Sequence, residues 1–103
     1  MAFGIGINTA APDYGNLKGK QLKVACDCWF SISGDMVPRL IRFEDEEGNR
    51  HSISEIQVLY SERRNFNGIP SVYYRCNIIF RNMKFEVSLI FFIERCQWVM
   101  NYL

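Results

Sequence analysis

Apolar residues alternate with polar residues from Leu22 to Tyr102, and this two-residue period constrains the fold more than any other feature of the chain. In an extended strand, successive side chains point to opposite faces, so the pattern predicts half-buried strands. The final dozen residues also fit a short helix, because Ile93, Gln97 and Met100 would share one side. We favour a strand there, since Cys, Trp, Val and Tyr prefer strands.

Turn-forming residues divide the alternating region into about six strands. Asp45–Asn49 is expected to be a hairpin tip, and Asn65–Pro70 the longest loop of the core. A shift of parity near Ser54-Glu55 indicates a bend or bulge.

The hairpin around Arg81–Met83 has two registers that keep apolar residues opposite each other. A loop at Asn82-Met83 pairs Phe80 with Phe85, and a loop at Arg81-Asn82 pairs Phe80 with Met83.

The chain of 103 residues has room for one domain. Residues 1–19 hold four of its seven glycines and are expected to form a flexible N-terminal arm. Residues 20–103 are expected to form a single all-β domain, a small antiparallel barrel or a tight sandwich. The pattern is typical of SH3-like and OB-like barrels, but no motif points to one family.

Charge and hydropathy exclude several classes of protein. Twelve basic and eleven acidic residues give a net charge of +1, which argues against a dedicated binder of duplex DNA. No apolar run approaches the roughly 20 residues that span a bilayer, and the N-terminus lacks the basic start of a signal peptide. We therefore expect a cytoplasmic protein with no membrane partner.

The four cysteines, Cys26, Cys28, Cys76 and Cys96, allow three interpretations. They are expected to be reduced thiols that pack as small apolar side chains. A zinc site and disulfides are the alternatives, although Cys26-x-Cys28 on a flat strand is a poor geometry for one metal ion. We expect no metal and no cofactor.

His51 is the only histidine, so mechanisms that need a histidine pair are excluded. A Cys–His dyad remains formally open, but nucleophilic cysteines usually lie on loops or helix starts rather than on core strands. With no other catalytic motif in the chain, we expect no enzyme activity.

Candidate binding residues centre on the segment from Arg63 to Gly68. Arginine and aromatic side chains dominate binding hot spots, and they also stack on bases and hold phosphates. The alternative is that Phe66 folds back onto the end of the barrel. Further arginines and aromatics lie on the outward parity of the strands. The predicted binding residues are Arg63, Arg64, Phe66, Trp29, Tyr73 and Arg75.

Two strands are apolar on both parities, which places Ile79, Ile90 and Phe92 on the outer side. These residues either lie beneath the N-terminal arm or meet another subunit. The leading hypothesis is a non-enzymatic interaction module that binds a protein partner, or itself, through the Arg/aromatic loop and this apolar patch. A single-stranded nucleic-acid binder and a metal- or thiol-dependent protein are the alternatives.

Overall fold

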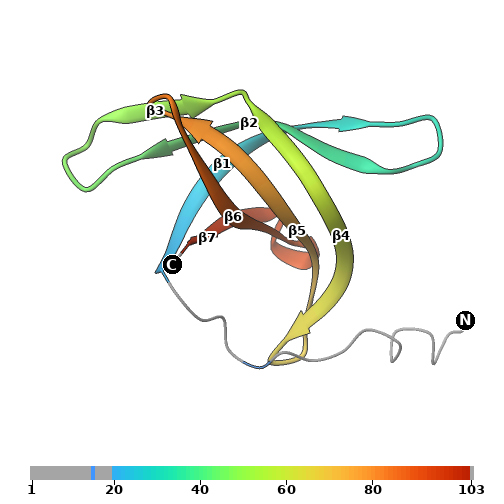
Figure 1. The fold of residues 1–103 in the computed structure, drawn as a ribbon. Coiled ribbons are helices and arrows are strands. Elements are labelled where there is room, and N and C mark those ends of the chain that lie inside the picture. Colours follow the sequence, from blue (N-terminus) through green and yellow to red (C-terminus); the bar gives the residue numbers. More distant parts are fainter. Residues whose placement is uncertain (1–14, 16–19, 103) are drawn as a thin grey trace, which may run out of the picture.

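The computed structural model describes Gly15 and residues 20–102, and residues 20–102 contain a seven-stranded antiparallel sheet. Its order is β3-β2-β1-β7-β6-β5-β4 (Figure 1). The predicted arm at residues 1–19 lies outside the described residues, apart from Gly15. The strands are β1 (Lys20–Phe30), β2 (Met36–Glu44), β3 (Arg50–Ile53), β4 (Ile56–Phe66), β5 (Ile69–Phe80), β6 (Met83–Phe92) and β7 (Gln97–Tyr102).

The sheet curls into a half-barrel because its two edge strands are neighbours in the sequence (Figure 1). Only Ser54 and Glu55 connect β3 to β4. The backbone N–H of Ile79 donates a hydrogen bond to the carbonyl of Glu55 at 3.2 Å, which ties this link to β5. The predicted all-β antiparallel class is confirmed. Seven strands form rather than six, because the parity shift at Ser54-Glu55 separates two strands on opposite edges.

Two tight turns define the registers of the long hairpins. The prediction of a loop over Asn65–Pro70 is wrong, because Phe66 pairs with Ile69 and leaves only Asn67 and Gly68 in the turn. Both turn residues have positive φ, 52° and 78°, the conformation that an Asn-Gly hairpin turn adopts.

The second hairpin turn is Arg81-Asn82, with φ of 52° and 61°. Phe80 therefore pairs with Met83, which is the second of the two registers considered. The hairpin tip predicted at Asp45–Asn49 is confirmed, since the Asp45 N–H donates to the Asn49 carbonyl at 2.9 Å. The C-terminal strand is also confirmed, as β7, after a short 3₁₀ helix, η2 (Ile93–Arg95).

Each face of the sheet carries its own apolar cluster, because neighbouring residues of a strand point to opposite faces. The larger cluster has Leu89, Cys76 and Ile41 fully buried at its centre. The smaller cluster lies on the opposite side-chain parity and consists of Phe66, Tyr73, Ile90, Phe92 and Val99.

The predicted apolar outer patch is therefore not an exposed surface. Ile90 is 0% exposed and Phe92 is 6% exposed, because both pack into the smaller cluster. Phe66 contacts Phe92 edge to face, with ring centroids 6.4 Å apart. Ile79 alone of the three stays exposed.

Replacement of Leu89 tests the larger cluster. Leu89→Ala removes apolar atoms that are 0% exposed, so we expect the free energy of unfolding to fall by about 2–5 kcal/mol. Leu59→Ala, at a side chain that is 45% exposed, is the matched control and should lower it by less than about 1 kcal/mol. Urea denaturation measures both values. Equal losses for the two variants would contradict this assignment of the core.

Candidate binding site

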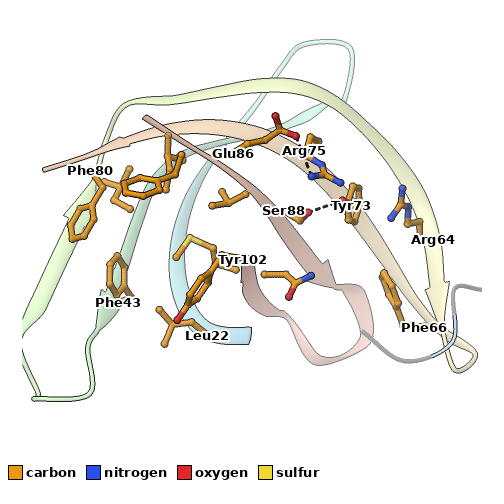
Figure 2. A pocket seen from close by; sticks show the side chains of 16 residues that line it. Leu22, Phe43, Arg64, Phe66, Tyr73, Arg75, Phe80, Glu86, Ser88 and Tyr102 are labelled. Atoms are coloured by element: carbon orange, nitrogen blue, oxygen red, sulfur yellow. Dashed lines mark hydrogen bonds and ion pairs between the residues drawn. The ribbon is translucent and has the colours of Figure 1, made fainter. Parts of the chain in front are cut away.

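A cavity of about 690 Å³ lies where β6 extends beyond its pairing with β7. Its wall contains residues of both side-chain parities from β5 and β6, so it borders both faces of the sheet. Figure 2 shows Phe80, Phe43 and Leu22 on one side of the β6 ribbon, and Tyr73, Arg64 and Phe66 on the other. The cavity thus has an apolar wall and a more polar wall.

The polar wall is organised around the ring of Tyr73, on β5. The guanidinium carbon of Arg64 lies 3.5 Å from the ring centroid, and that of Arg75 lies 5.7 Å from it. Positions of this kind are favoured by the attraction between a cation and the face of an aromatic ring. The ring therefore holds two arginines from neighbouring strands beside one cavity.

Both arginines already have a carboxylate partner. Arg64 Nη2 lies 3.1 Å from Glu62 Oε1, and Arg75 Nη1 lies 3.2 Å from Glu86 Oε2. The Arg64 side chain is only 14% exposed, so its position is well constrained. These ion pairs leave the polar wall with little excess charge.

Hydroxyl and amide groups continue the polar wall towards β7. The hydroxyls of Tyr73 and Ser88 share a hydrogen bond of 2.6 Å (Figure 2). Asn101 pairs with Ser88 across the sheet and also lines the cavity. Its Oδ1 atom is buried and accepts no hydrogen bond from the described part of the chain.

The opposite wall belongs to the face of the larger cluster. Apolar side chains are typical of binding pockets, in which a few polar groups fix the orientation of the ligand. The apolar wall includes Ile53, Ile78, Phe80, Phe85, Val87 and Met100.

Four of the six predicted binding residues line this cavity: Arg64, Phe66, Tyr73 and Arg75. The other two do not. Arg63 points to the opposite face of β4 from Arg64 and is exposed. Trp29 is 54% exposed in the β1–β2 hairpin, which projects from the half-barrel (Figure 1).

Phe66 also differs from its prediction as an exposed loop residue, because it is only 7% exposed. It packs at the end of the sheet, which is the alternative that the sequence left open.

Sequence reasoning missed Ser88 and Asn101. Each is a small polar residue in a strand whose neighbours are apolar, as in the run from Val87 to Ile93. A polar residue in such a run is a signal for a buried hydrogen bond. The signal does not show which polar groups meet, because that depends on the pairing of β6 with β7.

The four thiols do not come together. Cys26 Sγ lies 3.9 Å from Cys28 Sγ, and both pack against the larger cluster that contains the buried Cys76, whereas Cys96 is exposed beside η2. All four are free thiols. Within residues 20–102, no three His, Cys, Asp or Glu side chains are placed to hold a metal ion together.

Burial makes three of the thiols weak acids. It raises the pKa of Cys76 to about 12. Burial also raises the pKa of Cys26, with a further contribution from Cys28, and it raises the pKa of Cys28. Because the thiolate is the reactive form, these side chains are poor nucleophiles at neutral pH.

His51 lies beside the β2–β3 hairpin rather than at the cavity. Its Nε2 atom is 2.8 Å from Asp45 Oδ2, and this hydrogen bond is the main reason that the pKa of Asp45 is lowered to about 2. The His51 ring also packs against Phe43 and Phe80, with centroid distances of 5.2 and 5.3 Å. These contacts give His51 a structural role at the end of the larger cluster.

Alkylation of the cysteines tests the thiol environments. We expect Cys26 and Cys76 of the folded protein to react with iodoacetamide at least about tenfold more slowly than the exposed Cys96, because burial suppresses the thiolate and restricts access. Peptide mass spectrometry over a time course measures each rate. In urea all the thiols should react, and equal rates in the folded protein would show that the sulfurs are not buried as described.

Among the described residues, no helix has the length and apolar character needed to cross a membrane. Comparison with protein-family models, with curated proteins and with solved structures finds no match. The function is therefore argued from the cavity itself.

Proposed function

We propose that this protein is a non-enzymatic interaction module and that its cavity receives a segment of a protein partner. The observation that carries the proposal is the convergence of Arg64, Phe66, Tyr73 and Arg75 on one cavity whose opposite wall is apolar. Arginine and aromatic residues in a partly desolvated pocket are the side chains that contribute most to protein interfaces.

The charge of the site favours a protein partner over a nucleic acid. Binding to a phosphate backbone depends on unneutralised cations that displace counterions. Here Arg64 and Arg75 are paired with Glu62 and Glu86. Such an arrangement suits a ligand that buries apolar surface and forms a few hydrogen bonds, as partner side chains do.

The histidine and the thiols do not line the cavity, which supports binding rather than catalysis. His51 is held by Asp45 at a hairpin, and none of the four cysteines lines the cavity. The raised pKa values of Cys26 and Cys76 oppose formation of a thiolate.

The buried positions of Ile90 and Phe92 remove the argument for self-association through an apolar outer patch. The proposal therefore concerns a different protein as partner. That the protein is located in the cytoplasm is also part of the proposal.

Selection from a displayed library of random linear peptides tests this function. We expect the selection to enrich peptides that bind the wild-type protein. These peptides should bind the Arg75→Ala variant at least about tenfold more weakly, since loss of a central arginine typically costs about 2 kcal/mol of binding free energy. Arg63→Ala is the matched control, because Arg63 lies on the opposite face of β4 and should leave affinity unchanged. Isothermal titration calorimetry gives the affinities.

Two results would overturn the proposal. One is a selection that enriches no peptide, or only peptides that bind wild type and Arg75→Ala equally well. The other is tight binding of mixed single-stranded oligonucleotides that weakens steeply with salt, which would favour the nucleic-acid hypothesis.

A further inference from the structure

One edge of β6 is only partly covered. β5 pairs with β6 along the whole of Met83–Phe92, whereas β7 pairs with it only over Ser88–Phe92. The register continues with Tyr102 opposite Val87, and among the described strands none lies beside Met83–Glu86 on the side of β7. An uncovered edge exposes backbone donors and acceptors to which another strand can add.

The hairpin geometry shows which backbone groups face this edge. In a two-residue hairpin, the residues that flank the turn exchange hydrogen bonds, and here they are Phe80 and Met83. Hydrogen bonding to β5 then alternates along β6. The N–H and C=O groups of Lys84 and Glu86 consequently point away from β5, towards the uncovered edge. Ser88 lies two residues further along β6 and points its backbone groups the same way, and it pairs with β7.

The cavity surrounds this edge in the way that an added strand requires. Side chains of an added strand would point alternately to the two faces of the sheet, and the cavity borders both. One set would meet Phe85 and Val87 on the apolar wall. The other would meet Arg75 and Ser88 on the polar wall.

The charges near the polar wall indicate which side chains the added strand would direct to that wall. The alternation of β6 places Lys84 on the same face as Glu86, and both are exposed. Arg64 and Arg75 are each paired with a carboxylate, whereas Lys84 forms no ion pair with another described residue, which favours a ligand with an acidic side chain.

We propose that the partner segment is an extended strand that adds antiparallel to β6 along Met83–Glu86, in line with β7. The segment would alternate apolar side chains, directed to Phe85 and Val87, with acidic side chains, directed to the polar wall. The uncovered edge offers roughly 14 Å of backbone for this pairing. This inference rests on the proposed function, because it specifies how the same cavity binds its partner.

N-methylation of the selected peptides tests strand addition on the wild-type protein. Each backbone amide of a bound peptide is methylated in turn, and the affinity is measured by calorimetry. Because alternate amides of an added strand donate to β6, we expect losses of about tenfold or more at every second residue and small changes at the residues between. Equal sensitivity at all positions, or none, would overturn strand addition.

A proline at the edge gives the reciprocal test on the protein. Lys84→Pro removes an N–H that points away from β5, so the hairpin should be retained, as circular dichroism would show. We expect it to weaken peptide binding about tenfold or more relative to Lys84→Ala, which removes the same charge but keeps the N–H. If Lys84→Pro does not fold, the methylation pattern alone decides.

The outcomes separate this inference from the proposed function. Peptides that depend on Arg75 but show no alternating methylation pattern would leave the interaction module standing and overturn strand addition. A dimer detected by light scattering that Lys84→Pro dissociates would instead assign the edge to a second copy, and would also overturn a peptide partner. Failure to select any peptide would overturn both.

Discussion

The connection of two opposite sheet edges by only Ser54 and Glu55 is the constraint on which the rest of the structure depends. β3 and β4 stand at the two ends of the strand order, so a link this short forces the sheet to roll until its edges approach. The roll encloses the larger cluster around Leu89 and Cys76. An open, flat sheet of the same strands would leave that face in contact with water, which is unfavourable for so much apolar surface.

The period of two predicted the class of fold because it follows directly from strand geometry, whereas the arrangement of the strands depends on pairings distant in sequence. The turn at Asn67-Gly68 was the instructive error. The sequence pattern places asparagine and glycine in a loop up to Pro70, although both tolerate the positive φ of a two-residue hairpin turn. As a result Phe66 belongs to a strand and is buried, and Arg64 points to the cavity.

The candidate site was predictable in its residue types but not in its shape. The outward parity indicated Tyr73 and Arg75, which lie on the polar wall. The cavity exists because β7 covers only part of β6, and that depends on the pairing of Ser88 with Asn101. No local pattern encodes this pairing. Arg63 and Arg64 show the same limit, because adjacent residues of a strand face opposite ways and only the bulge between Val58 and Tyr60 fixes which of them faces the cavity.

The uncovered edge of β6 carries charged side chains, which bear on how selectively it would pair with another strand. Lys84 and Glu86 place opposite charges along this part of β6, and charged side chains are a common means of discouraging indiscriminate pairing between edges. Backbone hydrogen bonds alone are similar for every sequence, so they contribute affinity without selectivity. Selectivity must come from side chains that match the two walls. In the proposed complex, the ion pairs of Arg64 and Arg75 would contribute to this selectivity by holding the polar wall in place before binding, which lowers the conformational cost of binding.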